Sequence, residues 1–190
     1  MKNQPNRDYV SNDDVQTPPA LARRLVAHFQ PTGHILEPCS GGGHFLRALR
    51  AHSRRFAAPD RQHVSWAEIK RGRDFFAWTQ PVDWIVTNPP WSEIRRFLQH
   101  AMTLADHVVF LVTINHLWTK ARLRDLRTAG FGLREIVLVD MPKSFPQSGF
   151  QLGAVHLEKG WQGPIALSDL TARQGGPRRA AHAANSDCEE

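Results

Sequence analysis

The chain has 190 residues and a formal charge of +6, because 24 lysines and arginines stand against 18 acidic residues. That length suits one domain with short extensions, and a composition that is 41% hydrophobic and 22% charged can build a folded core. With two cysteines, no apolar run long enough to span a bilayer and no secretory leader at its start, the sequence excludes membrane-spanning and disulfide-rich classes and predicts a cytoplasmic protein.

The positive charge is concentrated in one segment. Residues 47–73 hold eight lysines and arginines against two acidic residues, which equals the excess of the whole chain. Arginine binds phosphate with a planar fork, so the segment is typical of a protein that faces a polyanion such as nucleic acid. A solvated, arginine-rich surface explains it equally well, and composition alone does not decide.

The first element expected after a polar arm, residues 1–16, is a helix. Leu21 and Phe29 belong to a set of apolar residues at helical spacing. Thr17 is a suitable N-cap, and Pro18 suits the first helical position, where a missing N–H costs nothing. A helix is therefore expected to begin at this pair.

The rest of the chain alternates between strand and helix patterns. The expected elements are a strand at 34–36, a helix at 45–54, strands at 64–69 and 84–87, a helix at 93–104, a strand at 108–112, a helix at 120–128, and strands at 135–139 and 152–157. This order indicates an α/β fold, a mostly parallel sheet with helices on both faces. The last two strands leave no room for a helix between them and should form an antiparallel hairpin at one edge. Residues 163–190 are expected to be a disordered tail.

A glycine-rich turn follows the first expected strand. Ligands bind at the carboxyl ends of strands in open parallel sheets, and Gly41 and Gly43 would let a ligand approach the backbone closely. A dinucleotide site would need a third glycine where Leu46 stands, so a compact nucleoside ligand is favoured. A purely structural turn between strand and helix fits the same residues.

An acidic residue after the second expected strand suggests a ribose site. Glu68 lies 25 residues beyond Gly43, where a carboxylate can accept hydrogen bonds from both ribose hydroxyls. Asp74 and Phe75 would add a polar group and an aromatic ring for an adenine. A surface role for Glu68 and a core role for Phe75 remain open.

The most specific motif is Asn88-Pro89-Pro90-Trp91, directly after a strand. Two consecutive prolines end the strand and leave the turn at the carboxyl edge of the sheet. The Asn88 side-chain oxygen and the Pro89 carbonyl would accept both hydrogens of an exocyclic amino group, and Trp91 would stack on the base. Such bonds localise the nitrogen lone pair and make the nitrogen more nucleophilic. A proline-rich turn beside a core tryptophan is the plainer alternative.

These motifs resemble those of S-adenosylmethionine-dependent amino-methyltransferases, most closely the N6-adenine DNA methyltransferases. Residues 37–46 are similar to their cofactor motif, and residues 88–91 match their catalytic motif, which usually ends in Tyr or Phe rather than Trp. The resemblance covers about residues 16–160 and implies a seven-stranded Rossmann-like class I fold with an antiparallel last strand.

The resemblance implies methyl transfer from S-adenosylmethionine to the N6 amino group of adenine in DNA. The residues that match catalytic positions are Asn88, Pro89, Pro90 and Trp91. The residues that match cofactor positions are Thr17, Pro18, Glu37, Pro38, Gly41, Gly43, Phe45, Glu68, Asp74 and Phe75.

How such an enzyme would choose its base is a separate question. Relatives with this motif order usually carry a separate target-recognition domain, whereas the catalytic domain expected here, residues 17–162, leaves no room for one. Base choice would then come from the loops at 91–96, 115–122 and 141–149 or from a partner chain, or the enzyme would have low sequence selectivity. A homodimer and a separate recognition chain are the two partner arrangements left open. The candidates for phosphate contacts, if they are more than exposed charges, are Arg95, Arg96 and Lys143.

Other chemistries fit the sequence less well. Covalent cytosine methylation needs a Pro-Cys nucleophile, but Pro38-Cys39 lies inside the cofactor turn. The ten histidines show no ligand spacing with Cys, Asp or Glu, so no metal is expected, and Ser40 lacks the preceding glycine of a nucleophile elbow. The Asn-Pro-Pro-aromatic turn also occurs in enzymes that methylate RNA bases or a protein glutamine. A non-catalytic nucleic-acid-binding subunit that keeps the fold is a further alternative. The basic composition favours nucleic acid over a protein acceptor, and the family resemblance implies DNA before RNA.

Overall fold

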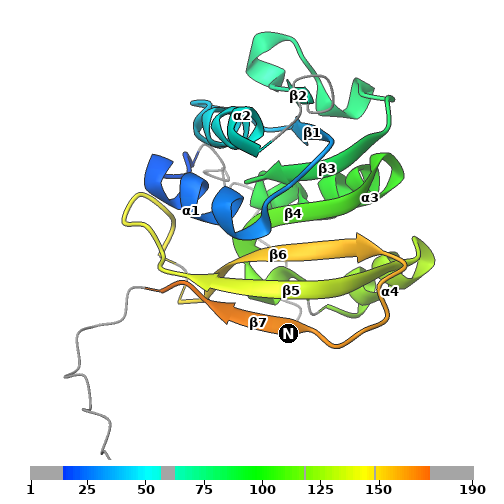
Figure 1. The fold of residues 1–190 in the computed structure, drawn as a ribbon. Helices are drawn as coiled ribbons and strands as arrows, with labels where there is room; N and C mark the ends of the chain where they lie inside the picture. Colours follow the sequence, from blue (N-terminus) through cyan, green and yellow to red (C-terminus); the bar gives the residue numbers. More distant parts are fainter. Residues whose placement is uncertain (1–14, 57–62, 118, 148, 172–190) are drawn as a thin grey trace, which may run out of the picture.

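The computed structural model describes residues 15–56, 63–117, 119–147 and 149–171 of the chain. The strands are β1 (His34–Glu37), β2 (His63–Trp66), β3 (Val82–Thr87), β4 (Ala105–Thr113), β5 (Phe131–Val139), β6 (Leu152–Lys159) and β7 (Ala166–Asp169). They form one sheet in the spatial order β2-β1-β3-β4-β6-β5-β7 (Figure 1). Strand β6 pairs antiparallel with both of its neighbours, while the other neighbouring pairs are parallel. Six strands therefore share one direction, as the predicted α/β pattern requires.

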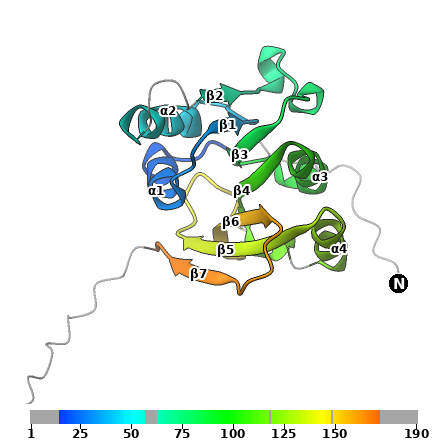
Figure 2. The ribbon, with the colours of Figure 1, turned by 45° about the vertical axis from the view of Figure 1, so that its right-hand side comes forward.

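Helices cover both faces of the sheet. They are α1 (Pro19–Phe29), α2 (His44–Phe56), α3 (Ile94–Leu104) and α4 (Lys120–Thr128). Helices α1 and α2 lie on one face, and α3 and α4 lie on the other (Figure 2). Each pair buries its apolar stripe against the sheet, so the core consists of two separate layers. The prediction of helices on both faces is confirmed.

Local sequence explains most of these elements. The apolar run in β4 is buried on both faces, as expected for a strand in the middle of a layered sheet. In α3, Phe97 and Ala101 lie on the buried side, one helical turn apart. Helix α4 begins after Thr119, whose hydroxyl accepts a hydrogen bond from the Arg122 amide at 3.3 Å.

The start of α1 corrects one expectation. The helix begins at Pro19, and Pro18 takes the cap position without any side-chain bond. Proline still occupies the first helical position, where its missing N–H costs nothing. Thr17 lies one residue too early to cap the helix, and its side chain is buried beside the cavity described below.

The carboxyl-terminal strands differ from the expected hairpin in two respects. Strands β5 and β6 pair antiparallel as predicted, but β6 is not the last strand of the sheet. Strand β7 follows it and pairs parallel with β5, although residues 163–190 are expected to be a disordered tail. Three of its four residues are exposed, so the strand buries little apolar surface and is held mainly by its backbone pairing with β5. The sheet therefore extends beyond residue 162, while the segment beyond residue 171 lies outside the described residues.

The parallel strands bring three loops to one edge of the sheet. The turns after β1, β2 and β3 all leave from carboxyl ends, since these strands are parallel neighbours. This is the edge at which open α/β sheets bind ligands.

Among the described helices, none has the length and hydropathy needed to cross a bilayer.

Candidate active site

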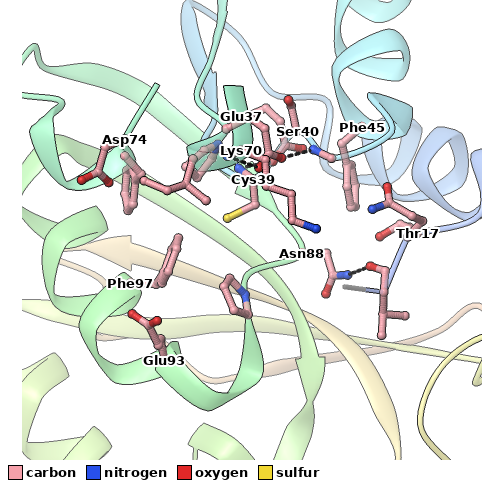
Figure 3. A pocket seen from close by; sticks show the side chains of 18 of the residues that line it. Thr17, Glu37, Cys39, Ser40, Phe45, Lys70, Asp74, Asn88, Glu93 and Phe97 are labelled. Carbon is pink, nitrogen blue, oxygen red and sulfur yellow. Dashed lines mark hydrogen bonds between the residues drawn. The ribbon is translucent and has the colours of Figure 1, made fainter. Parts of the chain in front are cut away.

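A cavity of about 350 Å³ lies at the carboxyl ends of β1 and β3 (Figure 3). Its volume is within the usual range of small-molecule sites, about 300–1,000 Å³. Eleven of the residues proposed from sequence line it: Thr17, Glu37, Pro38, Gly41, Phe45, Glu68, Asp74, Phe75, Asn88, Pro90 and Arg96. Segments that are far apart in the sequence thus converge on one site.

The glycine turn after β1 forms one wall of the cavity. Gly41 and Gly43 have φ angles of +43° and +77°, a region in which a side chain is strained. The Gly41 amide donates to a carboxylate oxygen of Glu68 at 2.6 Å, and the Gly42 amide donates to the side-chain oxygen of Gln16 at 2.6 Å. The turn therefore directs its amides at acceptors, as expected for a backbone that binds a polar ligand.

Glu37 is a buried acid in the cavity wall, with 1% of its surface exposed. Its Oε1 atom accepts hydrogen bonds from the Cys39 amide at 3.0 Å and from the Thr87 hydroxyl at 2.5 Å. Burial raises the pKa of Glu37 to about 8, and the bonds from Thr87 and Cys39 offset only part of that rise. The side chain is therefore mainly protonated at neutral pH when no cation lies beside it.

Glu68 organises the wall contributed by the end of β2. Besides accepting from Gly41, it caps a 3₁₀ turn at Ile69–Arg71 by accepting from the Lys70 amide at 3.2 Å. The cap places Ile69 in the cavity wall with 66% of its surface exposed. A carboxylate beside an exposed apolar side chain suits a ligand in which a polar ring is joined to an apolar ring.

Aromatic side chains form another part of the cavity wall. Phe75 stacks on Phe97 with ring centroids 5.3 Å apart, and it is 3% exposed. Asp74 caps the short turn that carries Phe75 by accepting from the Phe76 amide at 2.9 Å. Phe75 is thus a core residue that also lines the cavity, and its contact with an adenine stays a prediction.

Asn88 has a fixed orientation. Its side-chain nitrogen donates to the Val15 carbonyl at 3.0 Å, whereas its side-chain oxygen is buried and makes no hydrogen bond to any described residue. Thr17 Oγ1 and Ser40 Oγ are in the same condition, and both residues line the cavity. Buried polar atoms are nearly always paired, so these three atoms mark a cavity wall where a water or a polar ligand would complete the hydrogen bonds.

Some of the residues proposed from sequence do not line the cavity. Pro18, Gly43, Pro89 and Trp91 are absent from its wall, as are Arg95 and Lys143. The Trp91 indole donates to the Leu111 carbonyl at 3.2 Å, and its ring centroid lies 6.0 Å from that of Phe145. Trp91 is therefore held against the core beside the cavity, and stacking on a base stays a prediction.

The three proposed phosphate contacts differ in their surroundings. Arg95 makes a two-bond ion pair with Asp125, at 2.8 and 3.0 Å, which neutralises its charge locally. Arg96 lines the cavity, lies over the Phe76 ring 3.6 Å from its centroid, and makes an ion-pair contact with Glu93 at 3.4 Å. Lys143 is exposed in the loop after β5.

Several lining residues carry no clear signal in the sequence. Val15 and Gln16 fall in the expected arm, and they act through a backbone carbonyl and one amide side chain. His44 holds the same segment by bonding the Thr17 carbonyl at 2.6 Å. Of these lining residues, only Ile69 could have been identified from the sequence, because an apolar residue directly after the acid proposed to bind ribose suits the face of an adenine.

Comparison with known proteins agrees with this architecture. No protein-family model and no curated protein matches the chain. A putative class I S-adenosylmethionine-dependent methyltransferase from Listeria monocytogenes aligns over 86% of this chain and 68% of its own, with a TM-score of 0.62 and 13% identity. A modification subunit of a putative type I restriction enzyme from Vibrio vulnificus aligns over 85% of this chain and 48% of its own, with a TM-score of 0.59 and 14% identity. A putative RNA methyltransferase from Pyrococcus horikoshii aligns over 76% of this chain and 86% of its own, with a TM-score of 0.50 and 14% identity.

The sheet order and the glycine turn define a Rossmann-like α/β protein. More particularly, the chain has the fold of the class I S-adenosylmethionine-dependent methyltransferases. It spans about half the length of the Vibrio modification subunit.

Proposed function

We propose that the protein transfers a methyl group from S-adenosylmethionine to the N6 amino group of adenine in DNA. The observation that carries this proposal is the Asn88 side chain, anchored by its nitrogen to Val15 with its buried oxygen unpaired. An unpaired acceptor in a cavity wall calls for an N–H or O–H donor. An exocyclic amino group is such a donor, and adenine presents one.

The cavity fits S-adenosylmethionine. Its adenosine would lie between Ile69 and Phe75, with the ribose hydroxyls on Glu68, whose two oxygens keep acceptor capacity beyond their present bonds. The methionyl part would meet the glycine turn, Glu37 and the unpaired hydroxyl of Thr17. The chemistry that the cofactor supplies when bound is a methyl group on a cationic sulfur.

The protein's own contribution to the reaction is positioning. Asn88 Oδ1 and the Pro89 carbonyl would accept both amino hydrogens, which fixes the nitrogen and localises its lone pair. The Val15 carbonyl prevents the Asn88 amide from flipping, because a flipped amide would place an oxygen against that carbonyl. A duplex substrate would present its adenine by base flipping, with Trp91 stacking on the extruded base.

Nucleic acid is the acceptor that the surroundings favour. The net charge of +6 suits a polyanion, and Arg96 extends from the cavity wall. Three loops proposed for base choice meet at Trp91, whose ring centroid lies 6.2 Å from His116 and 6.0 Å from Phe145. Asn115 and Arg122, in one of these loops, carry buried polar atoms without partners among the described residues. A homodimer or a separate recognition chain would supply further contacts.

The Vibrio vulnificus neighbour, a modification subunit of a putative restriction enzyme, supports DNA as the substrate. The Pyrococcus horikoshii neighbour, a putative RNA methyltransferase, makes an RNA base the main alternative. A protein glutamine would also satisfy Asn88, since its amide nitrogen carries two hydrogens. A non-catalytic nucleic-acid-binding subunit is the alternative from another class.

The test is methyl transfer from tritiated S-adenosylmethionine to DNA, RNA and protein offered separately, followed by nucleoside analysis. We expect label in DNA, recovered as N6-methyladenine. Label found only in RNA or only in protein would change the assigned acceptor but would still identify a methyltransferase. Cofactor binding without transfer to any of the three would favour the non-catalytic subunit.

A further inference from the structure

A group of metal-ligating side chains lies outside the candidate active site. His107 is near the start of β4, and His156 and Glu158 are near the end of β6. The two strands are antiparallel neighbours, with His107 directly opposite Glu158 and His156 diagonal to it. Because side chains two residues apart in a strand share a face, these three gather on the side of the sheet that α1 covers.

The ligand atoms of this group already lie close together. His107 Nδ1 is 3.1 Å from His156 Nε2 and 3.8 Å from Glu158 Oε2, and all three atoms lie within 4.8 Å of one another. In a tetrahedral zinc site with bonds near 2.0–2.1 Å, neighbouring ligand atoms are about 3.4 Å apart. An ion could therefore enter with small movements of side chains rather than of strands.

The surroundings hold both imidazole rings in place. The indole of Trp84 stacks on His107, with centroids 4.3 Å apart, and on His156, with centroids 5.0 Å apart. Phe29 meets His156 edge-on at 5.7 Å. Side chains locked by packing keep the convergent arrangement that a metal site needs.

Access differs among the three ligands. His156 is 4% exposed, whereas the side chains of His107 and Glu158 are 27% and 21% exposed. The site thus opens to solvent on one side, so water can reach the ion as a fourth ligand. Arg134 already forms an ion pair with Glu158 Oε2, the oxygen that faces His107, but each carboxylate oxygen has two lone pairs and can serve both partners.

We propose that His107, His156 and Glu158 form a zinc-type site that fastens β4 to β6. Two imidazoles and one carboxylate suit zinc better than magnesium or calcium, which prefer all-oxygen ligands. The proposal departs from the expectation of no metal. That expectation rested on spacing along the chain, and here the ligands come from strands 49 residues apart.

The site is separate from the candidate active site. Trp84, opposite His107 in the β3–β4 register, lies four residues before Asn88, or about 13 Å along an extended strand. The ion would therefore stabilise the sheet at the amino ends of its parallel strands. It would take no part in methyl transfer, and the proposal stands or falls independently of the proposed function.

The test uses the full chain without an affinity tag, stripped with a chelator and titrated with zinc chloride in a calorimeter. We expect one ion per chain, with affinity reduced at least tenfold in His107→Gln and in Glu158→Gln. His28→Gln is the matched control, because His28 lies in α1 and bonds Glu135 instead of these ligands. Its zinc affinity should equal that of the parent. Parent-like binding by both ligand variants, or no binding by the parent, would overturn the proposal.

A second measurement needs no variant. Cobalt(II) titrated into the stripped parent should give the intense visible bands of a four-coordinate site and should be displaced by zinc. Zinc should also raise the thermal midpoint of the parent but not of His107→Gln, with circular dichroism confirming that both fold. A cobalt spectrum identical to that of the free hydrated ion would contradict the assignment without any substitution.

Discussion

The Asn88 side-chain nitrogen donates a hydrogen bond at 3.0 Å to the Val15 carbonyl, joining residues 73 positions apart in the chain. The bond decides which end of the amide meets the cavity, since the oxygen is left buried and unpaired. It also makes the segment before α1 part of the site, although the sequence predicts an arm there. The proposed chemistry depends on this orientation.

Removing the Thr17 hydroxyl should raise the stability of the protein and weaken its binding of S-adenosylmethionine. Its hydroxyl is buried without a partner among the described residues, which costs about 1–3 kcal/mol when no ligand is bound. Thr17→Val should therefore raise the free energy of unfolding by about 1 kcal/mol in urea and weaken S-adenosylmethionine binding about tenfold in calorimetry.

Thr87→Val is the matched control for Thr17. The Thr87 hydroxyl is equally buried but donates to Glu37, so its loss should lower the free energy of unfolding. If both variants shift stability in the same direction, the Thr17 hydroxyl has a partner in the free protein.

Gly41→Val should abolish cofactor binding. The residue has φ +43°, and a β-carbon there would lie 2.7 Å from the Gln16 side-chain oxygen, inside the cavity wall. Gly130→Val shares the positive φ, at +73°, but has nothing within 4 Å of its β-carbon and lies far from the cavity lining. The control should lose stability in thermal melting and keep cofactor affinity. Equal affinity in both variants would move the cofactor elsewhere.

The Glu37 carboxyl should make stability depend on pH. Burial raises its pKa from 4.5 to about 8, so the folded state holds a proton that the unfolded state releases between these values. The free energy of unfolding therefore falls as pH rises from about 4.5 to 8, by an amount on the order of 5 kcal/mol. Urea unfolding between pH 5 and 9 should show a smaller decline in Glu37→Gln than in the parent. Parallel profiles would show that Glu37 is not the group responsible.

The three proposed phosphate contacts should differ in their effect on DNA binding. Arg95 makes a short two-bond ion pair with Asp125, whereas Arg96 makes a longer contact, with Glu93 at 3.4 Å, and Lys143 is exposed. Arg96→Ala and Lys143→Ala should each weaken DNA binding and reduce the slope of log affinity against log salt by about 1. Arg95→Ala should leave the slope unchanged. Fluorescence anisotropy at several salt concentrations measures this, and a larger effect from Arg95 would contradict it.

Most of the sheet could be predicted because its strands carry strong local signals. The buried run of β4 and the proline stop after β3 mark their elements from sequence alone. Strand β7 could not be predicted, since its residues are mostly exposed and its stability comes from the edge of β5. Tertiary pairing, rather than propensity, decides such a strand.

The candidate site likewise contains residues that local sequence signals identify and residues that only tertiary contacts bring into place. Gly41, Glu68 and Asn88 could be placed together because each follows a parallel strand and such ends meet at one edge. The part of Val15 could not be foreseen, since a backbone carbonyl is available at every residue and only the folded chain selects one. The displacement of Trp91 from the cavity wall likewise follows from packing against Phe145, a long-range contact.

The most direct test compares cofactor binding and methyl transfer in Asn88→Ala. The substitution removes the unpaired oxygen and also the hydrogen bond to the Val15 carbonyl, but it leaves the glycine turn, Glu37 and Glu68 in place. Calorimetric affinity for S-adenosylmethionine should therefore stay within about threefold of the parent. Single-turnover transfer of tritiated methyl to adenine in DNA should fall at least about 100-fold, as expected when a positioned polar group at the reacting centre is lost. Transfer at the parent rate would contradict the central claim that Asn88 holds the acceptor nitrogen.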